Sequence, residues 1–162
     1  MPSQTKFDFA SHTDKGLVRS HNEDAIAICP NEGLLILADG MGGYNAGEVA
    51  SQMSVEIVAQ RIKELRSSTW FPNMPWQSSA PSRWIKDAVT EANTKVIDQA
   101  NQNPENFGMG TTIVVALCHL DRLVVGHVGD SRAYRFRGGV LELITHDHSV
   151  LQSQRLKQPF LR

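Results

Sequence analysis

The sequence lacks the features that would place it in several large functional classes. Its 162 residues include two cysteines, Cys29 and Cys118, each within an apolar run, so we expect reduced, buried thiols and no disulfide. No apolar run approaches the length that spans a bilayer, and the polar residues 1–6 are not followed by a signal-peptide core. A formal net charge of −1 gives no electrostatic reason to bind nucleic acid or an anionic membrane. The expected location is therefore the cytoplasm.

The remaining composition is that of an ordinary globular domain. With 41% hydrophobic and 20% charged residues, residues 1–162 are expected to form a single domain with its own core. Hydrophobic periodicity predicts strands and helices, in this order: strands 25–29 and 34–38, helices 46–65 and 82–100, then strands 112–118, 123–128, 133–137 and 140–144. Asp121 and Arg122 are the expected hairpin turn between the first two of these later strands. Grouped strands with two helices between them favour an α+β fold with antiparallel pairing.

Several acidic residues fall at the predicted ends of strands. Glu23 and Asp24 precede the first strand, Asp39 ends the most apolar one, and Asp130 follows the run 124–129. Carboxylates at the ends of buried strands are held rigidly and can converge on one cavity. A cluster of hard oxygen ligands suits Mg²⁺ or Mn²⁺. Any one of these residues alone is as well explained by a capping role.

A glycine-rich loop follows Asp39. Three glycines occupy four positions in residues 40–43, which lets the backbone approach a ligand closely. A strand, such a loop and a helix also begin a dinucleotide-binding unit, so a nucleotide-binding protein is a remote alternative. That pattern would need a small residue where Asn45 stands, and Asp39 would place negative charge beside the pyrophosphate.

Five motifs occur in an order that is similar to a known enzyme family. Residues 16–24 read GLVRSHNED, residues 38–51 contain ADGMGG followed by AGEVAS, residues 110–112 read GTT, residues 127–134 read HVGDSRAY, and residues 147–149 read DHS. Together they resemble the PP2C-type metal-dependent serine/threonine protein phosphatases, in their bacterial form. The resemblance extends over about residues 13–149.

The resemblance implies a fold, a reaction and partners. The fold would be a sandwich of two antiparallel β-sheets flanked by α-helices. The reaction would be hydrolysis of phosphoserine and phosphothreonine by metal-activated water, with two or three Mn²⁺ or Mg²⁺ ions and no covalent enzyme intermediate. The partners would be phosphorylated proteins, the substrates of a serine/threonine kinase.

The resemblance also implies a set of metal ligands. Asp39 matches the aspartate that bridges two ions. The backbone carbonyl of Gly40 and the side chain of Glu23 match ligands of one of these ions. Asp130 matches a ligand of a third, weaker ion found in bacterial relatives.

Two further residues match catalytic positions, and a third departs from the pattern. Asp24 matches a residue that orients metal-bound water. Arg19 matches the arginine that grips the substrate phosphate, a task that suits a guanidinium fork. Eukaryotic relatives have a histidine where this chain has Met41, and a thioether cannot protonate the leaving group. The general acid is therefore unassigned.

The last residues depart from the family pattern. The family uses two more aspartates, in DGL-like and DN motifs, and residues 149–162 contain no acidic residue. One catalytic ion would lose most of its protein ligands, so we expect a C-terminally truncated domain and little or no phosphatase activity from the 162-residue chain. The alternative is a catalytically inactive PP2C-like fragment that binds a metal or a protein partner.

Four polar residues near the last motifs invite a catalytic interpretation. His146 and His148 flank Asp147 and are expected to have structural hydrogen-bonding roles. No base is placed to activate Ser131, so Ser131 and Arg132 are expected to support the neighbouring Asp130.

Overall fold

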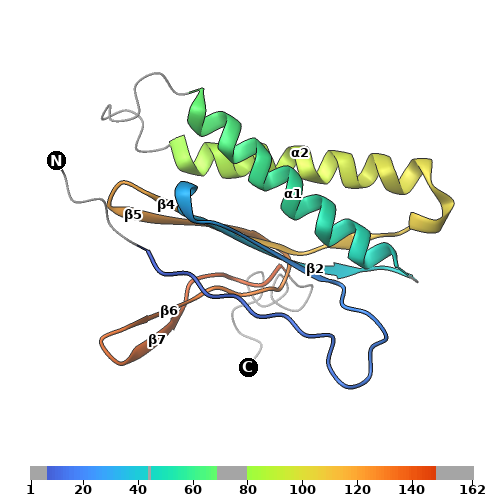
Figure 1. Cartoon of the computed structure of the whole chain (residues 1–162), viewed down its shortest axis with the longest axis horizontal. Helices are drawn as coiled ribbons and strands as arrows, with labels where there is room; N and C mark the ends of the chain where they lie inside the picture. The colour runs from blue at the N-terminus through green and yellow to red at the C-terminus, as the bar shows by residue number, and fades with distance from the viewer. Residues whose placement is uncertain (1–6, 44, 69–79, 149–162) are drawn as a thin grey trace, which may run out of the picture.

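The computed structural model describes residues 7–43, 45–68 and 80–148 (Figure 1). In chain order its elements are β1 (Asp24–Cys29), a 3-10 helix (Pro30–Glu32), β2 (Leu34–Met41), α1 (Ala46–Ser67), α2 (Ala80–Gln102), a second 3-10 helix (Pro104–Asn106), β3 (Gly110–Thr111), β4 (Ile113–His119), β5 (Arg122–Val128), β6 (Tyr134–Arg137) and β7 (Val140–Leu143).

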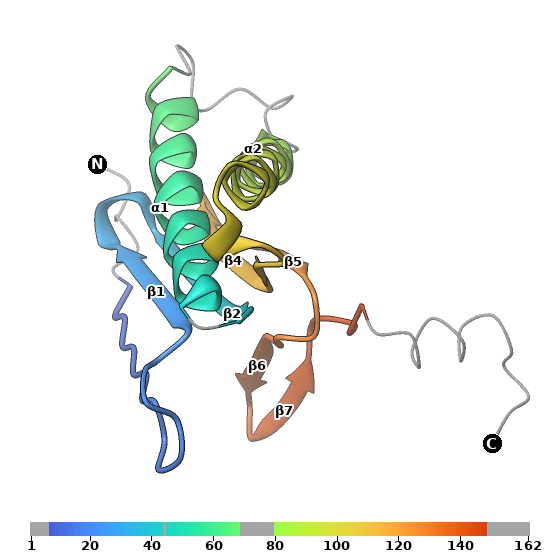
Figure 2. The ribbon, with the colours of Figure 1, turned by 90° about the vertical axis from the view of Figure 1, so that its right-hand side faces the viewer.

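The strands form two antiparallel sheets. The main sheet has five strands in the order β1-β2-β4-β5, with β3 also paired to β2, and the second sheet is the hairpin β6-β7. Helices α1 and α2 cover one face of the main sheet, and the β6-β7 hairpin lies on its opposite side (Figures 1 and 2). The main sheet therefore has a helix-covered face and an outer face.

The core lies between the helices and the covered face. Side chains alternate between the two faces of a strand, and Leu34, Ile36 and Ala38 of β2 are fully buried under the helices. Val115 and Leu117 of β4 are also fully buried beside them. The alternation of buried apolar residues along each strand therefore indicates which face of the strand the helices cover.

Each helix buries one stripe of side chains. Val58 and Ile62 of α1, and Ala88 and Ala92 of α2, are four residues apart and point to the core. The small alanines allow α2 to approach the sheet closely. None of the helices in the described ranges is both long and apolar enough to cross a bilayer.

The predicted strands and both predicted helices are confirmed, and each helix runs a little beyond its predicted bounds. The predicted turn at Asp121 and Arg122 is wrong by one residue. His119 pairs with Arg122, which leaves Leu120 and Asp121 in the turn. Leu120 adopts a left-handed φ of 55°, a conformation that its residue type does not signal.

The two cysteines lie on different strands of the main sheet. Cys29 and Cys118 are both free, and both are half-buried. Burial raises the pKa of each thiol above its usual value, which keeps both protonated. The expected absence of a disulfide between them agrees with this placement, because β2 separates the strands that carry them.

Candidate active site

β1 and β2 carry two aspartates side by side. The antiparallel register pairs Asp24 with Asp39, next to the pair Ala25 and Ala38. Both alanines are buried against the helices, so both aspartates lie on the outer face of the sheet. Cβ atoms of directly opposed residues in antiparallel strands are about 4.5–5.5 Å apart. The register of one hairpin thus brings together two carboxylates that are distant in sequence.

Asp39 is the centre of an acidic group. Burial raises the pKa of its carboxyl above the usual value, and the nearby carboxylates of Asp24, Asp130 and Glu23 raise it further. Asp130 reaches this place from the bend that follows β5. The other three acidic residues proposed from the sequence are therefore close enough to Asp39 for their charges to act on it. Crowded negative charge of this kind is what a divalent cation neutralises.

Glu23 lies between an arginine and a helix end. The Arg19 guanidinium forms an ion pair with the Glu23 carboxylate, and the Arg19 side chain is 70% exposed whereas that of Glu23 is 11% exposed. The other Glu23 oxygen, Oε1, faces Gly47 in the first turn of α1. A carboxylate at this position is stabilised by the positive end of the helix dipole. The structure therefore brings Arg19 to the edge of the acidic group, where it contacts Glu23.

Gly40 and Gly47 pack backbone against backbone. The Gly40 amide donates a hydrogen bond to the Glu23 carbonyl at 3.0 Å. A Cβ atom at Gly40 would collide with the Gly47 carbonyl, and one at Gly47 would lie 2.7 Å from Glu23 Oε1. Only glycine fits at both positions. This close approach fixes the α1 N-terminus against the strand end that follows Asp39.

A second ion pair holds the segment around Asp130. Arg132 donates two hydrogen bonds to the Asp147 carboxylate, at 2.8 and 2.6 Å, in a bidentate arrangement. Arg132 lowers the pKa of Asp147 below its usual value. The pair joins the loop after β5 to the segment after β7. Asp147 is thereby a structural partner of Arg132 in the described part of the chain.

The histidines in this region contact one another and the backbone. His127 Nε2 lies 2.7 Å from the His146 carbonyl oxygen, and its ring is 4.5 Å from that of His148. The His148 amide donates to the Gly129 carbonyl at 2.9 Å. The Gly129 amide also donates to His148 Nδ1 at 3.4 Å, which agrees with the hydrogen-bonding role predicted for His148. His146 takes part through its backbone carbonyl, so the role predicted for its side chain stays a prediction.

The donor set has the chemistry of a Mg²⁺ or Mn²⁺ site, but it is not a closed cage. Within residues 7–43, 45–68 and 80–148, no three His, Cys, Asp or Glu side chains converge closely enough to hold a metal ion. Mg²⁺ usually takes one or two carboxylates and keeps several water ligands. The carboxylates around Asp39 and the adjacent Gly40 carbonyl suit such a partly hydrated cation.

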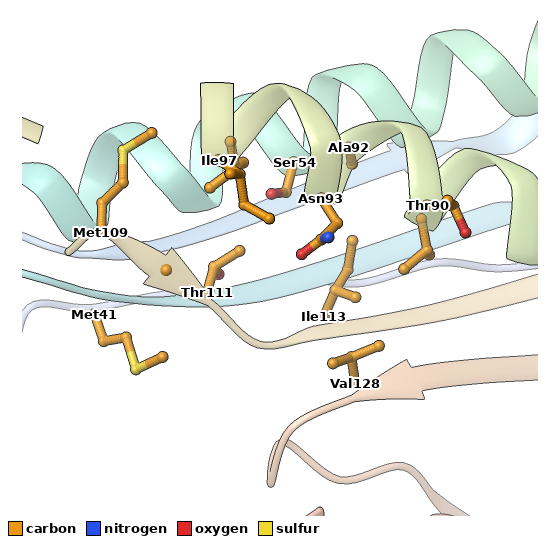
Figure 3. Close-up of a pocket in the computed structure, with 13 residues that line it drawn as sticks. Met41, Ser54, Thr90, Ala92, Asn93, Ile97, Met109, Thr111, Ile113 and Val128 are labelled. Atoms are coloured by element: carbon orange, nitrogen blue, oxygen red, sulfur yellow. The ribbon is translucent and has the colours of Figure 1, made fainter. Parts of the chain in front are cut away.

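A separate cavity of about 460 Å³ lies between the helices and the strands β3, β4 and β5 (Figure 3). Thr90, Asn93 and Ile97 of α2 form one wall, and Met41 and Met109 lie at one end. None of the residues that line it is charged. Met41, which is 64% exposed, is the residue of β2 that lines this cavity.

Residues 10–155 match the sequence profile of the family described as protein phosphatase 2C. The chain belongs to the protein phosphatase 2C family. The serine/threonine phosphatase stp of Listeria monocytogenes is 34% identical over 142 residues, covering 86% of this chain and 54% of that protein. The α+β fold expected from the resemblance, with two antiparallel sheets and flanking helices, is confirmed.

Solved structures of protein phosphatase 2C relatives superpose on this chain. The crystal structure of the Mycobacterium tuberculosis serine/threonine phosphatase PstP/Ppp gives a TM-score of 0.75 at 35% identity, covering 91% of this chain and 57% of that chain. The catalytic domain of PstP in complex with two manganese ions gives 0.72 at 36% identity, covering 91% and 59%. This chain spans about half the length of the curated relatives named stp.

The nucleotide-binding alternative does not agree with the topology. A dinucleotide-binding unit returns from its helix to a strand parallel to the first. Here β2 is antiparallel to both strands with which it pairs after the helices, β3 and β4. The Glu23 carboxylate also lies at the α1 N-terminus, where a phosphate would have to bind.

The GTT motif at residues 110–112 was recognised in the sequence, but no role was predicted for its residues. Thr111 Oγ1 donates to the Asp39 carbonyl at 2.9 Å, and the Asp39 amide donates to Thr112 Oγ1 at 3.2 Å. The available signal for Thr111 and Thr112 was that hydroxyl residues stand at the start of a strand otherwise made of apolar residues. The pairing of Arg132 with Asp147 was also not predicted.

Proposed function

We propose that this chain is part of a metal-dependent phosphatase that hydrolyses phosphoserine and phosphothreonine in proteins. In this proposal residues 1–162 belong to one protein phosphatase 2C domain. The observation that carries it is the pairing of Asp24 with Asp39 at the end of β1 and β2, within electrostatic reach of Asp130 and Glu23 and beside the close-packed Gly40. Membership of the family and the names of the relatives support this reaction.

The metal ligands in this proposal are those that the motifs indicate. Asp39 would serve two Mn²⁺ or Mg²⁺ ions, the Gly40 carbonyl and Glu23 would help to hold one of them, and Asp130 would hold a third. When bound, such ions would supply a hydroxide nucleophile at neutral pH and neutralise charge on the phosphate. The two manganese ions in the PstP catalytic domain support the choice of metal.

Two residues of this chain act on the substrate and on water. Arg19 binds the substrate phosphate, for which its mostly exposed guanidinium at the edge of the acidic group is suited. Asp24, which pairs with Asp39 in the register of β1 and β2, would orient the attacking water. Met41 has no proton to donate, so the general acid stays unassigned in this proposal.

The proposed partners are phosphorylated proteins that a serine/threonine kinase has modified, in the cytoplasm. A balanced charge supports a site that recognises phosphate locally, without binding nucleic acid or an anionic membrane.

A second candidate is a catalytically inactive chain that binds a metal or a protein partner. It is favoured by one observation: no closed set of three ligands forms among the described residues. Both candidates predict cation binding at Asp39, and they differ in turnover.

The test combines metal binding with turnover. We expect the 162-residue chain to bind Mn²⁺, measured from the loss of free Mn²⁺ by electron paramagnetic resonance. Asp39→Asn should weaken this affinity by more than about tenfold, because an amide cannot supply the negative charge. Glu142→Gln is the matched control, because Glu142 is an exposed acidic residue on β7 that pairs with Arg135. We expect its affinity to equal that of the wild type.

Turnover is measured with a phosphothreonine peptide and Mn²⁺, with and without chelator. We expect slow hydrolysis at most, abolished by chelator and by Asp39→Asn. Mn²⁺ binding without any turnover would favour the inactive candidate. Equal Mn²⁺ affinity in the wild type and in Asp39→Asn would overturn the site itself.

A further inference from the structure

The β-ladder of the main sheet is interrupted at one residue, Thr112. The register that pairs Gly40 with Thr111 is the same as the register that pairs Leu37 with Val114, so Asp39 faces Thr112. The Thr112 amide donates to the Asp39 carbonyl at 2.9 Å, as in a regular ladder. The Asp39 amide, however, donates to the Thr112 hydroxyl at 3.2 Å. A side-chain oxygen has replaced the backbone carbonyl as acceptor.

The same hydroxyl also contacts the loop that carries Asp130. Thr112 Oγ1 and Ser131 Oγ are 2.6 Å apart, in a partly buried position. The Thr112 methyl group packs against Gly129, where a Cβ atom would lie 2.7 Å from Thr112 Cγ2. One side chain therefore touches the backbone of Asp39 and both neighbours of Asp130.

The geometry points to Thr112 as a positioning residue that sets the distance between the Asp39 and Asp130 carboxylates. This inference rests on the proposed function, in which both carboxylates hold cations. Like charges on separate segments repel each other, and something must hold the segments at a fixed separation. Two hydrogen bonds to one hydroxyl provide that restraint.

The loop has a second attachment that does not involve Thr112. Arg132 binds Asp147 through two hydrogen bonds, and the His148 amide donates to the Gly129 carbonyl. Loss of the Thr112 hydroxyl should therefore move the loop without unfolding it. This independence makes the substitution at Thr112 interpretable.

Four variants separate the possible roles. Thr112→Val removes the hydroxyl and keeps the shape, and Thr112→Ser keeps the hydroxyl and removes the methyl group. Thr111→Val is the matched control, because Thr111 also binds the Asp39 backbone through its hydroxyl, and the hydrogen bonds found for it do not reach the Asp130 loop. Ser131→Ala breaks the same contact from the other side.

The first measurement uses the metal-free chain and nuclear magnetic resonance of its backbone amides. We expect Thr112→Val to shift the resonances of both Asp39 and Ser131. Thr111→Val should shift Asp39 and leave Ser131 unchanged. Unchanged loop resonances in Thr112→Val would overturn the inference whether or not the chain binds a cation. If Thr112→Val does not fold, Ser131→Ala must shift the Asp39 amide, and an unshifted Asp39 then has the same meaning.

The second measurement is Mn²⁺ affinity, compared with melting temperature. We expect Thr112→Val to weaken Mn²⁺ binding by about tenfold, the equivalent of about 1.4 kcal/mol, and Thr112→Ser to remain within about threefold of the wild type. The double variant Thr112→Val with Ser131→Ala should bind no more weakly than Thr112→Val alone, because both changes remove one contact. Equal affinity in all variants would overturn the inference, whereas a wild type that binds no Mn²⁺ would overturn the proposed function.

Discussion

The two faces of the main sheet differ in what covers them. On the helix-covered face Ile36 and Leu117 are fully buried, whereas on the outer face Leu37 is 38% and Leu123 is 62% exposed. The outer face and the β6-β7 hairpin enclose a cavity of about 610 Å³, lined in part by Leu37. Every residue of β6 and β7 is exposed. Neighbouring residues of a single strand thus lie in very different surroundings.

The two faces of the main sheet differ in what they contribute to folding stability and to the candidate site. Buried apolar area is the main source of folding free energy, and it is concentrated under α1 and α2. Asp39 and Met41 follow Leu37 on the outer face, at the end of the same strand. The candidate site therefore stands on the face that contributes less to stability, held in place by a strand whose other face is fully packed.

The largest expected effect comes from replacing one leucine on each face of the main sheet with alanine. Leu117→Ala should lower the free energy of unfolding by about 2–5 kcal/mol, because it leaves a cavity in a packed core. Leu37→Ala should cost about 1 kcal/mol or less, because its side chain is already partly in water. Urea unfolding of both variants measures the difference. Equal losses would mean that the outer face carries as much of the stability as the covered one.

A smaller effect is expected where the covered face meets the site. An alanine in a helix is normally favoured over glycine by about 1 kcal/mol. Gly47→Ala should instead lower the free energy of unfolding by about 1–3 kcal/mol, because its Cβ would lie 2.7 Å from Glu23 Oε1. Gly43→Ala is the control, because no atom lies within 4 Å of a Cβ there. A stabilising Gly47→Ala would show that the close approach of α1 is not fixed.

The smallest effect concerns pH and the covered face alone. His119 is 8% exposed and packs edge-on against Trp84, and burial with the nearby Arg66 lowers its pKa below 6.5. Its Nε2 atom has no hydrogen-bond partner among the described residues. The unfolded chain takes up the proton first as pH falls, so the stabilisation present above about pH 6.5 is lost below it.

Chemical unfolding at pH 7.5 and pH 5.5 measures this loss. His119→Phe keeps an aromatic ring against Trp84 and cannot be protonated, so part of the pH dependence should disappear. An identical pH dependence in the variant would assign it to carboxylates elsewhere in the chain.

The secondary structure and the identity of the site residues could be predicted from the sequence, whereas the contacts among the site residues could not. Alternating apolar residues predicted the strands, and Glu23 and Asp39 were placed at their ends, because these signals are local. The pairing of Asp24 with Asp39 depends on hairpin register, which strand boundaries alone do not determine. The ion pair of Arg19 with Glu23 depends on the path of an irregular loop.

Thr112 shows most clearly what was not predictable. Its sequence position predicts an ordinary strand residue, and the run 112–118 was expected to be one continuous strand. Its role comes from an interrupted ladder and from contact with Ser131, which lies 19 residues further on. Such a role exists only when two distant segments have been folded together.

The separation of Asp39 and Thr112 along the sequence has a consequence for how the chain folds during synthesis. The hydrogen bond from Asp39 to Thr112 spans 73 positions, and at roughly 5–20 residues per second several seconds of translation separate its two ends. Until β4 is made, Asp39 leaves the ribosome on a hairpin that has no neighbour on that side. Contacts of such high contact order form late and slowly. The contacts that join Asp39 to β4 and to the Asp130 loop are therefore among the last that this part of the nascent chain forms.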